Sequence, residues 1–379
     1  MGLSSCFNDY ARRRDASHCG NDQRTTASRL RSKRRTRYAS SLILLLATAF
    51  CAQAETYRVA TWNVELSRKG PGLLLRDMIR GDDEQIRAVL AIIADVRPDV
   101  LLLQGVDFDQ TSEVLKRLAD AAGYDHHFAF PPNSGRQVGL DVDADGRLGE
   151  PEDALGFGRF FGEGGMALLS RFPIQIDVSH NYSDLLWKDL PETLLPSPDN
   201  AWPSQAVYDA LPLSSVGHWQ IPVTIPEGDL TLLAFHASPP VFDGPEDRNG
   251  LRNHDQIAFW QSAMDGVVGV VPEARFVVLG DANQDPFDGE GRKAAIQSLL
   301  ADHRLQDVAP QGAQGTDTVD WDEIGVGKLR VDYVLPSSDL DVIDSGVYWP
   351  TAETEEATTA RTASRHSLVW VDLKMSGRH

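Results

Sequence analysis

The sequence is poor in cysteine, and all of its cysteines lie near the N-terminus. The 379 residues include only 3 cysteines, Cys6, Cys19 and Cys51. Residues 55–379 therefore contain no thiol, which excludes a disulfide framework in that part of the chain. Any stability that this part needs beyond its hydrophobic core must come from another source.

Basic side chains are scarce beyond the first 54 residues. The whole chain has 36 Lys and Arg, 55 Asp and Glu, and a formal net charge of −19. The first 54 residues hold ten of the basic and three of the acidic groups, so residues 55–379 carry 26 and 52 of them, a net charge of −26. Affinity for nucleic acids comes mostly from Lys and Arg that neutralise phosphates. This charge therefore disfavours a polyanionic partner.

No apolar run is long enough for a stable membrane span, which needs roughly 20 residues. A basic stretch that ends at Arg37 leads instead into the short apolar run Ser41–Phe50, and the small residues Ala52 and Ala54 follow it. This order is typical of a signal peptide, so we predict a leader over residues 1–54, cleavage near Ala54, and export to the periplasm or the medium.

Residues 55–379 have the pattern of one α/β domain, which we expect to act as a monomer. The spacing of apolar residues after Asp82 and Asp83 predicts a helix up to Pro98, and Asn253–Met264 is a second predicted helix. The polar run Pro350–Thr362 predicts a mobile loop. Short apolar runs predict strands at Tyr57–Thr61, Val100–Leu103, Met166–Leu169, His218–Val223, Leu230–Phe235, Phe276–Leu279, Val331–Leu335 and Ser367–Leu373.

The segment 141–152 matches the pattern of an EF-type calcium loop. Acidic residues alternate at Asp141, Asp143 and Asp145, a glycine follows, and Glu152 closes the pattern. Carboxylates at these positions, with the backbone carbonyl of Arg147, would supply most of the oxygens that Ca²⁺ requires. We therefore predict a structural Ca²⁺ site inserted in the domain, and the alternative is a solvated acidic turn.

Six short motifs appear in a fixed order along residues 60–372. They are Ala60–Glu65, Gly165–Ile174, Ala234–Pro240, Val278–Pro286, Val331–Ser337 and Ala363–Asp372. Each motif alone is weak, but the ordered series resembles the endonuclease/exonuclease/phosphatase superfamily with the deoxyribonuclease I-like fold. The resemblance implies a four-layer αββα sandwich, in which two packed mixed β-sheets are flanked by helices.

The resemblance also implies roles for individual side chains in phosphoester hydrolysis. Asp281 matches the residue that activates or orients the attacking water, and Asn63 matches the residue that orients that aspartate. Asn283 matches a donor to the phosphate. His236 and His366 match two histidines that contact the phosphate, and Asp332 matches the carboxylate that pairs with the second histidine.

Two carboxylates of the family pattern are missing. The family's main metal-binding glutamate follows the glutamine at the end of the second strand, where this chain has Gly105, and the Asp before the final histidine is Arg365. One possibility is that Asp107 or Asp109 joins Glu65 in holding Mg²⁺ or Mn²⁺. A second is that Arg365 takes the place of the metal. A third is a degenerate site in a calcium-stabilised binding protein.

The segment Phe242–Asp255 is unusually polar for a connection. Arg248, Asn249, Asn253 and His254 lie within it, just beyond His236, and such side chains suit a compact anion. They suit the start of a helix equally well. With Arg365, these residues are the predicted substrate contacts of an exported phosphodiesterase or phosphatase that acts on a small phosphoester. A nuclease of the same superfamily is the alternative activity.

Overall fold

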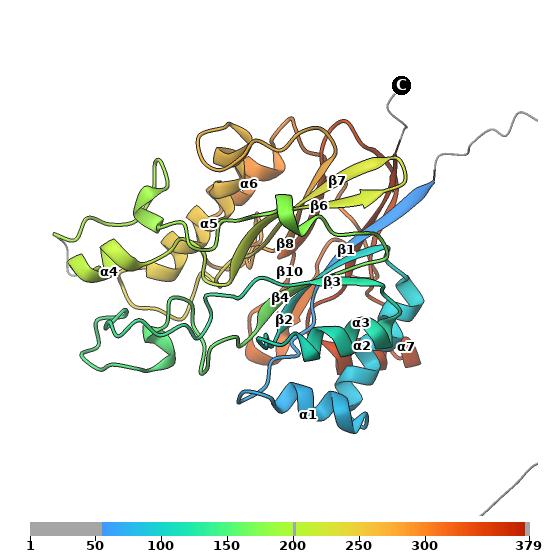
Figure 1. Ribbon diagram of the computed structural model, residues 1–379, viewed down its shortest axis with the longest axis horizontal. Helices are drawn as coiled ribbons and strands as arrows, with labels where there is room; N and C mark the ends of the chain where they lie inside the picture. Colours follow the sequence, from blue (N-terminus) through green and yellow to red (C-terminus); the bar gives the residue numbers. More distant parts are fainter. Residues whose placement is uncertain (1–54, 200–201, 376–379) are drawn as a thin grey trace, which may run out of the picture. The chain divides into compact units, whose positions relative to one another are not determined.

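Two β-sheets lie face to face in the computed structural model, which describes residues 55–199 and 202–375 (Figure 1). The predicted leader and its cleavage site lie outside the described residues. The larger sheet has the strand order β12-β13-β1-β2-β4-β3, and the other has the order β11-β8-β7-β6-β5. Both sheets mix parallel and antiparallel pairs, because β1 runs parallel to β2 and β7 runs parallel to β8.

The strands of the larger sheet are β1 (Thr56–Asn63), β2 (Val100–Val106), β3 (His126–Phe128), β4 (Gly165–Ser170), β12 (Asp341–Val347) and β13 (Val369–Lys374). Those of the other sheet are β5 (His180–Asn181), β6 (Gly217–Ile225), β7 (Gly228–His236), β8 (Phe276–Asp281) and β11 (Asp332–Pro336), and a separate ribbon joins β9 (Val319–Trp321) to β10 (Gly327–Leu329). The helices are α1 (Leu73–Arg80), α2 (Glu84–Val96), α3 (Glu113–Ala122), α4 (Gln205–Ala210), α5 (Arg248–Met264), α6 (Ala294–Leu300) and α7 (Glu355–Ala363). Short 3-10 turns span Pro151–Asp153, Ile176–Val178, Trp187–Asp189 and Asp322–Ile324.

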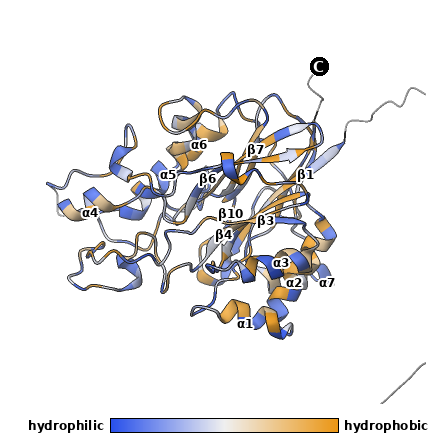
Figure 2. Ribbon diagram, in the orientation of Figure 1, coloured by the Kyte–Doolittle hydropathy of each residue, from blue (hydrophilic) through white to orange (hydrophobic). Residues whose placement is uncertain are grey.

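The central strands read as unbroken apolar runs because both of their faces are buried. Along β2, Val100 and Leu102 pack between the two sheets, whereas Leu101 and Leu103 pack under helices. Helices α1, α2, α3 and α7 share that core on the outer face of the larger sheet, and α4, α5 and α6 share another on the outer face of the second sheet. This arrangement is the expected four-layer αββα sandwich. Figure 2 shows helices that carry both hydrophobic and hydrophilic residues, as one-sided packing requires.

Local sequence signals explain where the helices begin. Asp83 caps α2, since its side chain accepts the backbone N–H of Ile86 at 2.9 Å, as the pattern predicted. Helix α5 contains the predicted helix but begins earlier, at Arg248. Among the described residues, no helix combines the length and the apolar character needed to cross a membrane.

The prediction of a loop over Pro350–Thr362 is wrong for Glu355–Thr362, because α7 forms there. The side chain of Thr354 caps the helix by accepting the backbone N–H of Ala357 at 3.1 Å. Acidic residues occupy the first turn and Arg361 the last, where each favours the helix dipole. The only buried residues of α7 are Ala357 and Ala363, so this helix has no apolar period to read.

Candidate active site

Three neighbouring strands of the five-stranded sheet bring a histidine and two aspartates together. In the register of the sheet, His236 of β7 is the partner of Asp281 of β8, and Asp281 is the partner of Asp332 of β11. Paired residues of adjacent strands project their side chains to the same side of a sheet. The fold therefore places these three side chains next to one another.

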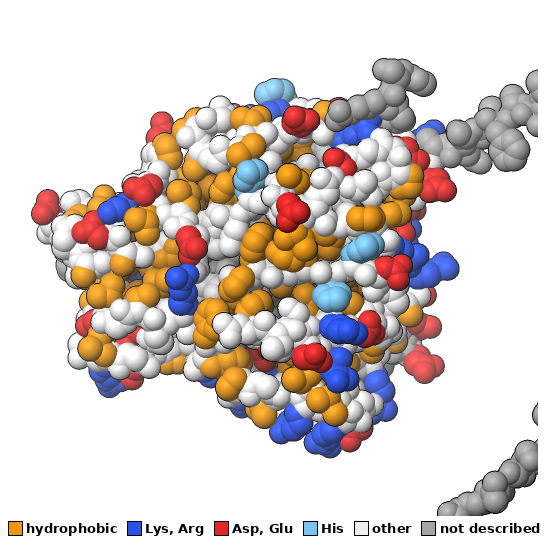
Figure 3. Space-filling model, in the orientation of Figure 1, with side chains coloured by type: hydrophobic (Ala, Val, Ile, Leu, Met, Phe, Trp, Pro, Cys, Tyr) orange, Lys and Arg blue, Asp and Glu red, His pale blue; other side chains and the backbone are white. Residues whose placement is uncertain are grey.

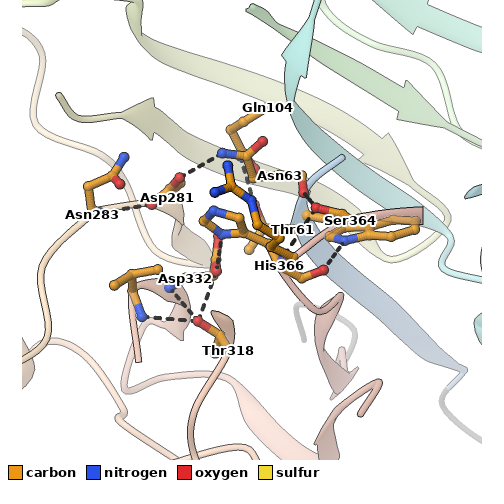
Figure 4. A network of polar contacts seen from close by, with 12 residues as sticks. Thr61, Asn63, Gln104, Asp281, Asn283, Thr318, Asp332, Ser364 and His366 are labelled. Atoms are coloured by element: carbon orange, nitrogen blue, oxygen red, sulfur yellow. Dashed lines mark hydrogen bonds and ion pairs between the residues drawn. The ribbon is translucent and has the colours of Figure 1, made fainter. Parts of the chain in front are cut away.

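Asp281 is fully buried and held at both carboxylate oxygens (Figure 4). The Asn63 amide Nδ2 donates to Oδ2 at 2.9 Å, and the backbone N–H of Asn283 donates to Oδ1 at 2.8 Å. Burial raises the pKa of Asp281 well above its usual range, and the neighbouring Asp332 raises it further. Asp281 is thus an oriented carboxylate that can accept a proton near neutral pH.

His366 and Asp332 form a buried ion pair. His366 Nδ1 lies 2.9 Å from Asp332 Oδ2, and the Thr318 hydroxyl donates to the same oxygen at 2.8 Å. Burial by itself would lower the pKa of His366, but Asp332 and then Asp281 raise it to about 9. His366 is therefore an imidazolium at neutral pH, as the resemblance implied for a histidine backed by a carboxylate.

His236 is the opposite kind of histidine. Burial lowers its pKa to about 3, so the ring is neutral, and Nε2 lies 3.5 Å from Asp281 Oδ2. Within the described residues Nδ1 is buried and has no hydrogen-bond partner. A buried nitrogen without a partner is costly unless a ligand or water meets it. His236 is thus a neutral ring beside Asp281, and its side chain is 13% exposed.

Asn283 lies at a backbone position that few residues adopt. Its φ is +50°, in the left-handed region that asparagine tolerates better than most side chains. Its amide Nδ2 donates to the carbonyl of Ala237 at 3.0 Å. Asn283 therefore joins the loop after β8 to the loop after β7, in addition to holding Asp281.

Beside this network, Glu65 and Arg365 form a second ion pair. Glu65 Oε1 accepts Arg365 Nε at 2.9 Å and also Nη2, while Oε2 accepts the backbone N–H of Arg365 at 2.8 Å. Ser364 fixes the pair, because its hydroxyl lies 2.7 Å from the Asn63 carbonyl and 3.1 Å from Glu65 Oε2. Burial would raise the pKa of Glu65, but the hydrogen bonds from Arg365 together with the positive charges of His366 and Arg365 lower it.

The two aspartates suggested as metal ligands have other partners. Asp107 accepts the backbone N–H groups of Arg68 at 2.9 Å and Gly164 at 3.1 Å, and burial raises its pKa to about 6. Asp109 accepts the backbone N–H groups of Glu113 and Val114 at the start of α3. Both carboxylates thus hold backbone in place, and the structure joins neither of them to Glu65.

The position of the family's metal-binding glutamate has no room for a side chain. Gly105 has a φ of +72°, and a Cβ atom there would lie 2.6 Å from Asn63 Oδ1. With Glu65 already paired to Arg365, the residues at this position do not fit the metal site that the resemblance implies.

Another set of residues in the site could hold a metal ion. Ligand atoms of Asp281, Asp332 and His366 lie within 4.8 Å of one another, which is consistent with metal-dependent catalysis. His366 would first have to lose its proton, because a metal ligand must be deprotonated.

The residues of the polar segment after His236 mostly support backbone. Asn253 is fully buried and donates Nδ2 to the carbonyls of Ser238 and Ala282, which follow β7 and β8. Asn249 donates Nδ2 to the carbonyl of Val241 at 2.7 Å. The structure thus gives both asparagines a positioning role. Arg248 begins α5, and His254 pairs with Asp255 at 3.0 Å.

In the acidic loop 141–152, the three alternating aspartates lie together as predicted, but Glu152 does not join them. Ligand atoms of Asp141, Asp143 and Asp145 lie within 4.8 Å of one another. Glu152 is exposed and does not belong to this group, because a 3-10 turn begins at Pro151.

The next residue, Asp153, is the one that turns inward. It is buried and accepts the backbone N–H groups of Val142 and Gly149. The side chain of Arg147 contacts Glu150 at 3.2 Å.

Sequence reasoning assigned no role to Thr318 or Ser364. Thr318 accepts the backbone N–H groups of Val331 and Asp332 at 3.0 Å each and donates to the Asp332 carboxylate. Ser364 lies in the last of the six motifs, so its place beside His366 was a usable signal. Nothing in the sequence around Thr318 indicates its role.

Comparison with known proteins agrees with this geometry. Residues 60–366 match the model of the Endonuclease/Exonuclease/phosphatase family. Curated protein sequences show no significant match. An endonuclease/exonuclease/phosphatase from Beutenbergia cavernae has a similar structure, with a TM-score of 0.52 and 22% identity over 85% of this chain and 72% of that one.

Two further structures have the same fold. Family proteins from Bacteroides thetaiotaomicron and Bacteroides vulgatus each have a TM-score of 0.50 and 14% identity over 85% of this chain, and 98% and 100% of their own chains are covered. Because the family model spans most of the sequence and these structures share the fold, the chain belongs to the Endonuclease/Exonuclease/phosphatase family.

Proposed function

We propose that the protein hydrolyses a small phosphoester by direct attack of water on phosphorus. The observation that carries this proposal is the buried Asp281 carboxylate, held by Asn63 and Asn283 beside the imidazolium of His366. Hydrolysis of a phosphoester needs a positioned water, a group that takes its proton, and donors for the phosphoryl oxygens. The network offers the proton acceptor and the donors from rigid strand ends.

The two halves of the reaction fall to different residues. Asp281 accepts a proton from water as the oxygen attacks phosphorus, because its raised pKa suits a base near neutral pH. His366 and His236 donate to the phosphoryl oxygens. His366 does so as a cation, and His236 does so as a neutral ring that carries a single N–H. The bond to the leaving oxygen breaks, and that oxygen takes up a proton from solvent.

The charge of the chain favours a small substrate over a nucleic acid. Figure 3 shows Lys and Arg side chains over α1, α2 and α3 with acidic side chains among them. Several of these cations are paired, as Arg76 is with Asp77 and Lys116 is with Asp120. Paired cations offer little to a polyanion, so phosphodiesterase or phosphatase activity is preferred to nuclease activity. From the leader we also infer that the enzyme acts outside the cytoplasm.

A substrate panel tests the proposed hydrolysis. Bis-p-nitrophenyl phosphate represents diesters, and p-nitrophenyl phosphate represents monoesters. We expect release of nitrophenol from at least one of them, and loss of that activity in Asp281→Asn. Binding without turnover by the folded wild type, in every ionic condition, would instead support the binding-protein alternative.

A further inference from the structure

Arg365 is a cation that several hydrogen bonds hold in place beside the candidate active site. It directly precedes His366, and its partner Glu65 lies two residues after Asn63, so both belong to segments that build the site. The pair is anchored by the backbone N–H of Arg365 and by the Ser364 hydroxyl as well as by the guanidinium. An arginine restrained at so many points loses little freedom when it binds an anion.

The guanidinium still has donors to offer. Its Nε and Nη2 donate to Glu65 Oε1, and across the described residues no acceptor meets Nη1. The Arg365 side chain is 50% exposed, compared with 3% for His366. One edge of the guanidinium is therefore fixed by Glu65, and the other is accessible to a ligand.

Compared with the family pattern, this part of the site carries more positive charge, with Glu65 and Glu323 as the carboxylates near Arg365. Relative to the family pattern, Gly105 removes one negative charge, and Arg365 exchanges another for a positive one. Together the two replacements make this part of the site three charge units more positive, which offsets the loss of a divalent cation. The steric constraint at Gly105, where a Cβ atom would meet Asn63 Oδ1 at 2.6 Å, prevents a simple return to the family's ligand set.

We propose that Arg365, held by Glu65, binds a phosphoryl oxygen in place of the family's metal ion, so that this enzyme needs no divalent cation for hydrolysis. The proposal deepens the proposed function and rests on it for turnover, but the binding of phosphate can be measured independently. Asp281 remains the residue that accepts the proton from water, and His366 remains a donor to the phosphoryl oxygens.

Inorganic phosphate is the probe for the binding test, titrated by calorimetry into the full-length protein in EDTA. We expect wild type to bind phosphate equally well in EDTA and in Mg²⁺ or Mn²⁺. Arg365→Ala should weaken binding about tenfold or more, as expected when a charge-assisted hydrogen bond is lost. Arg361→Ala removes an exposed arginine four residues earlier and should leave binding unchanged. If Arg365→Ala loses its circular dichroism spectrum, Arg365→Gln provides the same test.

Turnover of the nitrophenyl substrates in EDTA then separates the two proposals. Full activity in EDTA that Arg365→Ala abolishes supports both. Activity or phosphate binding that requires added Mg²⁺ or Mn²⁺, and that survives Arg365→Ala, overturns the metal-free site but leaves phosphoester hydrolysis standing. Phosphate binding that depends on Arg365, without turnover in any condition, removes the proposed hydrolysis and keeps the cation site.

Discussion

The two ion pairs of the site differ in how far they are exposed to solvent. Asp332 and His366 have side chains that are 0% and 3% exposed, next to the buried Asp281. Glu65 and Arg365 have side chains that are 24% and 50% exposed. The inner pair matches the pattern that the resemblance implies, and in the outer pair Arg365 departs from that pattern.

This difference separates two physical tasks. Proton transfer near neutral pH requires pKa values that burial and close charges can shift, and the pKa values of Asp281 and His366 are both raised. Binding of a phosphate also requires donors that the ligand can reach, and Arg365, whose side chain is half exposed, offers more accessible donors than the buried His366. The outer pair can therefore change its chemistry while the proton-transfer residues stay the same.

The largest expected effect is the loss of the inner carboxylate. Asp281→Asn keeps the shape of the side chain but removes the base, and general-base catalysis contributes roughly 10² to 10⁴ in rate. We expect kcat to fall by about a thousandfold while the melting temperature holds or rises, since a buried carboxylate is costly. Asp341→Asn, at an exposed position of β12, is the matched control. A kcat within tenfold of wild type would remove Asp281 from the mechanism.

The pH profile of kcat/KM tests the inner ion pair. Asp281 must be ionised, so activity falls as pH drops through its raised pKa, and His366 must be protonated, so activity falls as pH rises through about 9. Asp332→Asn removes the charge that raises the pKa of His366. We expect its alkaline limb to move to lower pH and its rate to fall about a hundredfold.

Titration of the His366 ring by NMR checks the assignment of this limb directly. Thr358→Val, on the exposed side of α7, should leave the profile unchanged. An alkaline limb that stays in place in Asp332→Asn would mean that another group causes it.

The inner half of the site was predictable because strong signals surround it. The resemblance pointed to Asp281 and Asp332, which end β8 and begin β11, and the antiparallel pairing of these two strands brings them together. His366 and Asn63 belong to motifs at the ends of β13 and β1. The four layers followed from the same motifs by resemblance.

The other parts of the site and fold could not be predicted in this way, because the sequence does not show which of several similar side chains turns inward. Asp109 could have been a metal ligand or a helix cap, and the backbone of α3 decides in favour of the cap. Glu152 and Asp153 are adjacent acids, and the turn at Pro151 directs only the second one into the loop. The polar helix α7 is stabilised by caps and by two buried alanines, which leave no periodic signal.

Gly105→Ala tests the steric constraint beside Asn63 and Glu65. The new Cβ atom would meet Asn63 Oδ1 at 2.6 Å, at a backbone φ of +72°. We expect the free energy of unfolding in urea to fall by about 2 to 3 kcal/mol, from backbone strain and overpacking together. Gly81→Ala has a φ of +68° with nothing within 4 Å of its Cβ, so its loss should reflect backbone strain alone, about 1 kcal/mol. Equal losses in both variants would contradict a steric constraint at Gly105.

The smallest effect concerns chelation, which should distinguish the acidic loop from the catalytic site. If the loop binds Ca²⁺ only in the folded protein, a free concentration of ten times Kd adds roughly 1.4 kcal/mol to the free energy of unfolding. We expect EDTA to lower the melting temperature accordingly and to leave hydrolysis unchanged. Asp143→Asn should remove the response to Ca²⁺, whereas Asp177→Asn, an exposed acid outside the loop, should keep it. A melting temperature that ignores Ca²⁺ in wild type would make the loop a solvated turn. Because the loop and the site share no residues, that outcome would leave the proposed role of Arg365 untouched.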